Sequence, residues 1–171
     1  MSTNSIRISD AARAAIDKTI ALLKTLKPDQ FEMSHWTCKN PGAGGTRGRL
    51  CDTTACLAGW ITIAQMPRAE LARYFGKDAP YNANSVDYER LAAGHLGQGP
   101  ERPEWISVLH NLFMMPEGYK MVLFDRQPAR KRHAAAIRVL EILRDTGRED
   151  WPQALRDAGI DPSELIRQDR E

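Results

Sequence analysis

The sequence has little net charge, few cysteines and no long apolar run, and each of these features excludes a class of protein. Its 171 residues carry a formal net charge of +2, which makes no general case for binding nucleic acid or an acidic membrane surface. The uncharged stretch from Thr53 to Pro67 is too short to span a bilayer, so no membrane partner is expected. Residues 1–10 contain no apolar run, so we expect no secretory signal peptide.

The cysteine content and the overall composition favour an ordinary intracellular domain. Three cysteines are an odd number, which fits a reducing cytoplasm better than a disulfide framework. An apolar fraction of 42% and a charged fraction of 27% are typical of globular proteins, and the length suits one domain. Alternating strand patterns are absent, which argues against a Rossmann fold or a barrel. We therefore expect a single cytoplasmic domain.

The spacing of apolar residues predicts an all-α fold, an irregular multi-helix single domain over residues 1–171 with at most one short strand or hairpin. Ser9 is a good N-cap for the first helix, which Pro28 ends. A glycine-rich loop is expected over residues 37–50. Further helices are expected from Thr53 or Thr54 to about Met66, from Pro67 to Phe75, from Asn84 or Ser85 to Leu96, from Pro103 through Phe113, from Pro128 to Asp145, and in short segments introduced by Trp151 and Asp161, while Gly118 to Phe124 is the one candidate strand.

The densest group of candidate functional residues is the run from Cys51 to Trp60, with the sequence CDTTACLAGW. Together with the preceding Phe31-x-Met33-x-x-Trp36 pattern, it resembles a group of uncharacterised phage and bacterial proteins. Asp52 departs from that pattern, in which a glycine is expected. The resemblance implies a phage or mobile-element accessory protein and brings no known activity with it. Its weaker later elements are Leu96-Gly97, Leu112-Phe113 and Trp151-Pro152.

One interpretation of the cysteines is a structural zinc site. His35 and Cys38, followed by Cys51 and Cys56, supply one nitrogen and three sulfur ligands, which is enough for a closed tetrahedral site. The glycine-rich loop between the two pairs is easy to fold around a metal ion. We expect no cofactor from the sequence as a whole, and zinc is the one alternative that it suggests.

A second interpretation makes Cys56 a catalytic thiol. A cysteine near a helix N-terminus is expected to have a lowered pKa, because the helix dipole favours the thiolate. The base would then be one of the four histidines, brought close by the fold. A third interpretation is a Cys51–Cys56 disulfide, against which a reducing cytoplasm argues. The interpretation that we favour is a buried cysteine that acts as a small apolar residue in the core.

A basic cluster lies around the start of the last long helix. Its positive charges could bind phosphate groups. No aromatic residues alternate with these charges, which is more typical of a solvated helix face. The members of the cluster are Arg126, Arg130, Lys131, Arg132 and Arg138.

These observations favour an interaction protein over an enzyme. We expect a small cytoplasmic binding or accessory protein of phage origin that acts on a host or phage macromolecule, above all a protein, in an anti-defence role. One alternative is a thiol-dependent enzyme that uses Cys56. The other is a nucleic-acid binder that uses the basic helix at 126–138.

Overall fold

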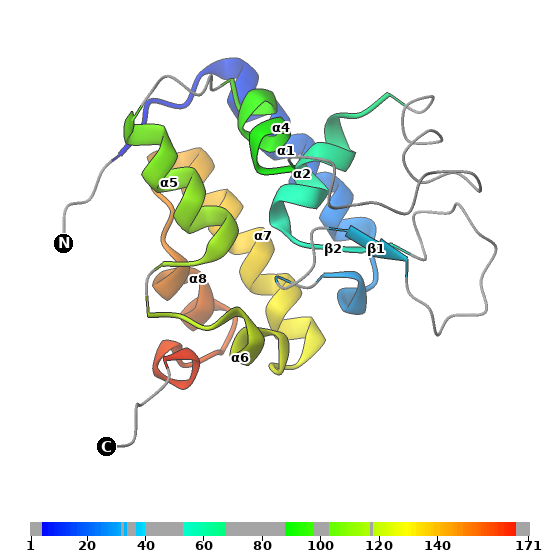
Figure 1. The fold of residues 1–171 in the computed structure, drawn as a ribbon, viewed down its shortest axis with the longest axis vertical. Coiled ribbons are helices and arrows are strands. Elements are labelled where there is room, and N and C mark those ends of the chain that lie inside the picture. The colour runs from blue at the N-terminus through cyan, green and yellow to red at the C-terminus, as the bar shows by residue number, and fades with distance from the viewer. Residues whose placement is uncertain are drawn as a thin grey trace.

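The computed structural model describes residues 5–31, 33, 37–39, 53–67, 88–97, 103–116 and 118–166 of the 171-residue chain. This part of the chain is mostly helical (Figure 1), which confirms the all-α prediction. Its one sheet has two short strands, and none of its helices is long and apolar enough to cross a membrane. The elements, in chain order, are α1 (Asp10–Thr25), η1 (Pro28–Gln30), β1 (Thr37–Lys39), β2 (Thr53–Ala55), α2 (Leu57–Gln65), α4 (Tyr88–His95), α5 (Pro103–Met114), α6 (Met121–Asp125), α7 (Ala129–Thr146), α8 (Trp151–Asp157) and η4 (Pro162–Leu165).

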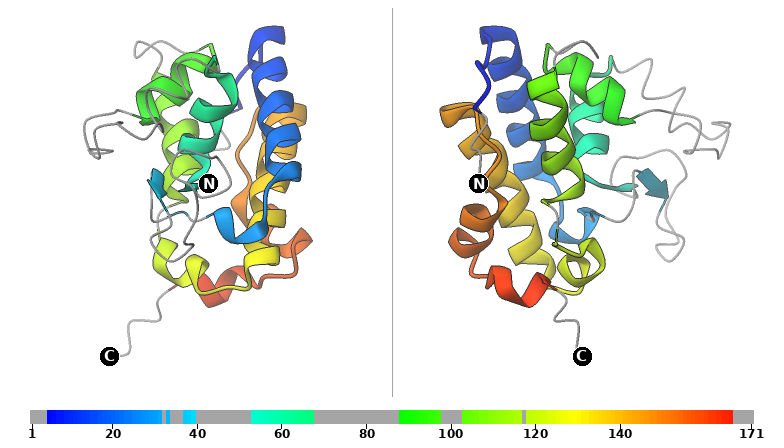
Figure 2. Two further views of the ribbon diagram at one scale, coloured as in Figure 1. Left: turned by 90° about the vertical axis from the view of Figure 1, so that its right-hand side faces the viewer. Right: turned by 60° about the vertical axis from the view of Figure 1, so that its left-hand side comes forward.

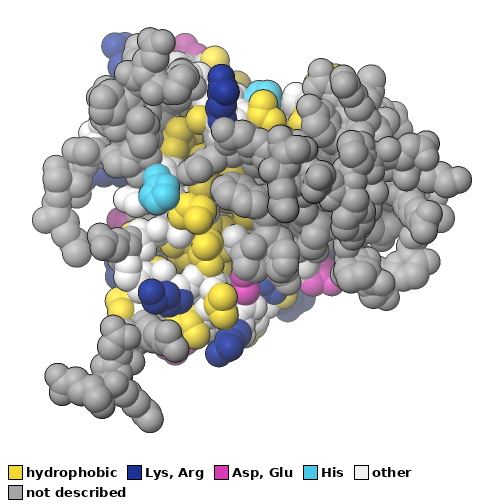
Figure 3. Space-filling model, viewed as in Figure 1, with side chains coloured by type: hydrophobic (Ala, Val, Ile, Leu, Met, Phe, Trp, Pro, Cys, Tyr) yellow, Lys and Arg dark blue, Asp and Glu magenta, His cyan; other side chains and the backbone are white. Residues whose placement is uncertain are grey.

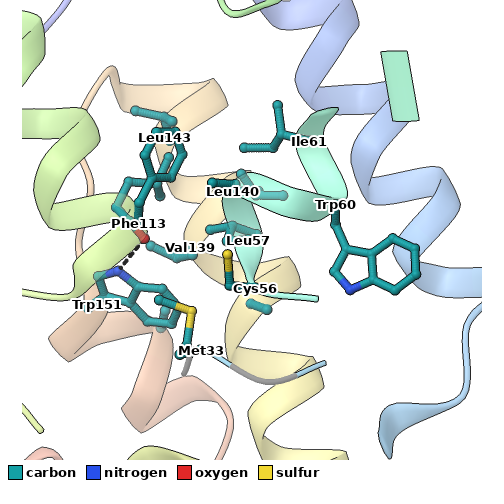
Figure 4. Packing of buried hydrophobic residues seen from close by; sticks show 14 of the residues in the cluster. Met33, Cys56, Leu57, Trp60, Ile61, Phe113, Val139, Leu140, Leu143 and Trp151 are labelled. Atoms are coloured by element: carbon teal, nitrogen blue, oxygen red, sulfur yellow. Dashed lines mark hydrogen bonds between the residues drawn. The ribbon is translucent and has the colours of Figure 1, made fainter. Parts of the chain in front are cut away.

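Helix α2 lies at the centre of the core, because it is apolar on all sides. Every residue from Leu57 to Ala64 is buried. Figure 4 shows Leu57 on the side of α2 that faces Val139 and Leu140 of α7, and Trp60 on the opposite side. The buried cluster around α2 has members from all seven described α-helices. The prediction of one domain over residues 1–171 extends beyond the described residues and stays a prediction.

Helices α1 and α7 are the longest described helices and lie side by side (Figure 2). The Oγ atom of Ser9 accepts a hydrogen bond from the Ala12 amide at 3.2 Å, which confirms the predicted N-cap. Arg144 of α7 contacts the Asp17 carboxylate of α1 at 2.8 Å. The two helices therefore form one wall of the core, joined at its exposed edge by an ion pair.

The prediction that the motif's threonines cap the central helix is wrong. Thr53–Ala55 forms strand β2, which pairs with Thr37–Lys39 in an antiparallel sheet. The helix begins at Leu57, and Cys56 is its N-cap residue. β-branched threonines favour an extended backbone where a partner strand is available, and that partner lies far away in the sequence.

The prediction of a strand from Gly118 to Phe124 is also wrong. Tyr119 alone makes an isolated antiparallel bridge to Ile166, and the chain then turns into α6. The bridge cannot extend into a ladder, because the residues before Ile166 form the 3-10 helix η4. The candidate strand therefore has no extended partner beyond its first pair.

Aromatic packing anchors the short helix α6 to the rest of the molecule. The ring of Phe124 lies edge to face against Phe31, with 6.2 Å between centroids, and against Trp151, with 5.7 Å. The indole N–H of Trp151 donates to the Asn111 carbonyl at 3.0 Å. These contacts connect η1, α5, α6 and α8, and they offset the weak intrinsic stability of a helix of five residues.

Other helix predictions are confirmed where the structure describes the chain. Helix α5 begins at Pro103, α7 follows Pro128, and α8 and η4 begin at Trp151 and Pro162. Helix α4 ends before Gly97, whose φ of 76° is left-handed, as the predicted stop requires. Three predictions lie wholly or partly outside the described residues. They are the start of the helix at Asn84 or Ser85, nearly all of the helix from Pro67 to Phe75, and most of the loop at 37–50. The first three residues of that loop form β1.

Candidate functional site

Cys56 connects the small sheet to the central helix, and its side chain points into the core. Its carbonyl accepts the first hydrogen bond of α2, from the Trp60 amide at 3.0 Å. The residue is 2% exposed and lies in the buried apolar cluster. Figure 4 places its sulfur beside Leu57, with Met33 and Val139 nearby. The interpretation of Cys56 as a buried core residue agrees with this environment.

The expected lowering of the Cys56 pKa is wrong. Burial raises the pKa of the thiol from 9.0 to about 11. The main-chain amides of Gly59 and Ala58 at the helix N-terminus lower this pKa, and the charge of Asp125 raises it, but desolvation has the largest effect. At neutral pH the thiol is therefore protonated and shielded from solvent, which does not favour a role as nucleophile.

Two of the four proposed zinc ligands lie outside the described residues. Cys38 lies on β1 opposite Thr54 of β2, and Cys56 follows the end of β2 by one residue, so the backbone brings these two proposed ligands to the same small sheet. His35 and Cys51 are not described. Among the described residues no group of three His, Cys, Asp or Glu side chains could hold a metal ion. Zinc binding stays a prediction. Cys56 is not disulfide-bonded, so the proposed Cys51–Cys56 disulfide is absent.

A polar cluster that sequence analysis missed lies at the junction of α6 and α7. The Asp125 Oδ1 atom accepts a hydrogen bond from the Met33 amide at 2.9 Å and lies 3.5 Å from Nη1 of Arg132. The side chains of Asp125 and Arg132 are 14% and 8% exposed. Within the described part of the chain, the buried Nε atom of Arg132 has no hydrogen-bond partner. No sequence signal reveals this cluster, because 92 residues separate Met33 from Asp125.

The function of this cluster in the fold follows from its partners. Asp125 connects the main chain of Met33, which follows η1, to the start of α7. A carboxylate that accepts from both an amide and a guanidinium suits a buried position, since each charge is compensated. The geometry therefore describes a structural connection, and it also supplies the negative charge that acts on Cys56.

The predicted basic cluster does not form one surface. Arg132 is buried, because residues 130–132 point to three different sides of a helix with 3.6 residues per turn. Arg138 pairs with Asp157 at 2.6 Å, and Lys131 donates to the Gly159 carbonyl. Arg126 and Arg130 are exposed, and no ion pair to another described residue engages either of them.

Two exposed apolar side chains lie on adjoining segments, α6 and the end of η4. Val122 of α6 is 58% exposed and Ile166, which follows η4, is 45% exposed. Figure 3 shows hydrophobic and basic side chains beside one another in the lower part of the view, where Figure 1 places α6. Sequence analysis missed this surface, because a helix of five residues is too short to reveal which side chains face inward.

Comparison of the chain with protein-family models, with curated proteins and with solved structures finds no match.

Proposed function

We propose that this chain is a binding protein that acts by contacting another macromolecule, in the first place a protein. The observation that carries the proposal is the pair of exposed apolar side chains, Val122 and Ile166, on segments held against each other. Single exposed apolar residues are common, but neighbouring ones on fixed backbone suit a contact surface. The third large exposed apolar side chain of the described residues, Leu91 on α4, is 37% exposed.

The environment of Cys56 supports an interaction protein over a thiol-dependent enzyme. A thiol with a pKa near 11 in an apolar core has neither the charge nor the access that a nucleophile needs. The nucleic-acid alternative has weaker support than the sequence suggested, since Lys131, Arg132 and Arg138 contact groups within the chain. Exposed Arg126 and Arg130 remain for such a role.

The resemblance of the motif to phage and bacterial proteins extends the proposal. It favours an accessory role of anti-defence type, in which the chain acts on a macromolecule of the bacterial host. The odd number of cysteines favours a cytoplasmic location for this contact.

The proposal predicts a defined complex. A tagged chain produced in a bacterial host is expected to co-purify with one host protein at fixed stoichiometry, and the complex is expected to form again from the two purified components. A chain that stays monomeric when mixed with each co-purified candidate would contradict the proposal. Retention on DNA or RNA that weakens steeply with salt would favour the nucleic-acid alternative instead.

The thiol-enzyme alternative has a separate test. We expect Cys56 to resist a mild alkylating reagent at pH 6 and to react after unfolding, with the labelled position read by mass spectrometry. Stoichiometric labelling of the native chain at that pH would support the enzyme and weaken the present proposal.

A further inference from the structure

We propose that Trp151 holds a strained joint after α5 in place, and that α6 and η4 leave the core together as one unit when the contacts of its indole ring break. The joint is Met115 with Pro116, which directly follow the last residue of α5. The inference describes a conformational change built into the fold. It goes beyond the proposed function and does not depend on it.

The backbone of the joint is strained. Met115 has a φ of 62°, and no other residue except glycine has a positive φ in the part of the chain that the structure describes. Left-handed backbone is unfavourable for a residue with a Cβ, and a following proline restricts that residue further. The Met115 side chain is 3% exposed and belongs to the core cluster. Strain of this kind persists only where surrounding contacts enforce it.

The end of α5 shows which contact enforces the strain. A helix that ends in a left-handed residue commonly closes with a hydrogen bond from the amide of the next residue to the carbonyl five positions earlier. Here that amide would belong to position 116, but Pro116 has no N–H. The Trp151 indole takes its place, because its nitrogen lies 3.0 Å from the Asn111 carbonyl oxygen and 3.2 Å from that of Leu112 (Figure 4). A side chain 40 residues away therefore caps α5.

Trp151 also holds α6. Its ring packs edge to face against Phe124, with 5.7 Å between the centroids, and the same Phe124 ring contacts Phe31 at 6.2 Å. The chain before α6 is bonded to η4, since the Lys120 amide donates to the Leu165 carbonyl at 3.0 Å beside the isolated bridge. These two helices with the bonds between them form the α6–η4 unit. Loss of the Trp151 contacts acts on the whole unit, and the contact with Phe31 keeps the open state a minor population.

The opening is expected to be local, with α6 turning about its C-terminal end. Helices of five and four residues have little stability of their own. Asp125, the last residue of α6, accepts from the Met33 amide and lies beside Arg132, and neither contact involves Trp151. Left-handed glycines border the unit, Gly118 with a φ of 93° and Gly159 with a φ of 73°. The unit is therefore expected to move most at the end that faces the joint.

Native-state hydrogen exchange of the full ¹⁵N-labelled chain tests the inference. The amides of Lys120 and Phe124 report on the unit, because both bond within it. The Leu140 amide, in the middle of α7, reports on the core. We expect the two unit amides to share one opening free energy and to be protected at least about tenfold less than Leu140. Equal protection of all three would show that the unit opens only with the whole fold, and would overturn the inference.

Two substitutions test the cap itself. Trp151→Phe retains a ring against Phe124 and removes the indole N–H, so it is expected to lower the protection of the unit about tenfold. Pro116→Ala supplies an amide N–H at position 116 that can donate to the Asn111 carbonyl. In that background Trp151→Phe should lower the protection only about threefold. An equal loss in both backgrounds would mean that Trp151 acts by packing alone, and would overturn the inference.

Gln65→Ala is the matched control. The Gln65 side chain donates to the Ala15 carbonyl at 3.0 Å and joins α2 to α1, away from the unit. Its loss is expected to lower the protection of Leu140 and to leave that of Lys120 and Phe124 unchanged, because this bond stays intact in the local opening. A loss of protection at all three amides would contradict a local opening. Thermal unfolding checks that each variant folds, and the native chain and this control decide the outcome even where Trp151→Phe does not fold.

Discussion

The Ile6 amide donates a 2.8 Å hydrogen bond to the Gly147 carbonyl, and the carbonyl oxygen of Ile6 occupies the space where a side chain at residue 147 would begin. Gly147 also has a left-handed φ of 70° as the C-cap of α7. Glycine is required there twice over, for its backbone conformation and for its missing Cβ. The segment before α1 is thereby fastened to the end of α7.

This relationship predicts that Gly147→Ala destabilises the protein by about 3 kcal/mol, from left-handed strain of about 1 kcal/mol together with the collision. Gly159→Ala is the matched control, because Gly159 has a φ of 73° and its nearest neighbour in that direction is the Lys131 side chain at 3.8 Å. It is expected to cost about 1 kcal/mol. Chemical denaturation measures both values. Equal costs would show that Ile6 is not closely packed on Gly147.

The pairing of Asp125 with Arg132 predicts unequal costs for the two partners. Asp125→Ala leaves a buried guanidinium without its carboxylate and the Met33 amide without its acceptor, so we expect a loss of about 3 kcal/mol. Arg132→Met leaves the Asp125 carboxylate without its cation but with the Met33 amide as a donor, and Asp125 is the more exposed partner, so its cost should be smaller. In a double-mutant cycle measured by denaturant unfolding, the double variant should lose less stability than the two single variants lose together. Additive losses would contradict a direct interaction.

The raised pKa of Cys56 predicts a loss of stability at alkaline pH. The unfolded chain releases the thiol proton near pH 9, whereas the folded chain holds it until about pH 11, so stability is present below pH 9 and is lost as pH rises toward 11. A shift of about two pKa units corresponds to a loss of about 3 kcal/mol. The unfolding free energy of the native chain should therefore fall more steeply over this range than that of Cys56→Ala. Parallel curves would show that the folded thiol titrates normally.

Metal analysis discriminates between the zinc and core-packing interpretations. Zinc binding by His35, Cys38, Cys51 and Cys56 predicts one ion per chain after purification without chelator, and a fall in melting temperature when a chelator removes it. Cys51→Ser should then lower the zinc content, while Cys56 stays buried. A metal-free chain with an unchanged melting temperature would eliminate the site and leave Cys56 as a core residue alone.

The predictions that succeeded depend on interactions within a few residues. Ser9, Asp150 and Asp161 each accept a hydrogen bond from an amide two or three positions further along the chain. Such caps are visible in the sequence because both partners lie side by side in it. The two wrong assignments depend instead on a partner segment elsewhere in the chain. Thr53 lies in a strand because the partner strand β1 is present. Residues 118–124 do not form a strand, because the residues that would face them form the 3-10 helix η4.

The sequence by itself determined that the protein is helical, and it identified Cys56 as a central position, because helical periodicity and capping are local properties. Only the tertiary structure decided what those residues do. Burial among distant segments keeps the Cys56 thiol protonated, contact with Asp125 turns Arg132 inward, and the anchoring of Phe124 leaves Val122 exposed. Burial and charge pairing arise where segments far apart in the sequence come into contact, and the spacing of residues along the chain does not predict those contacts.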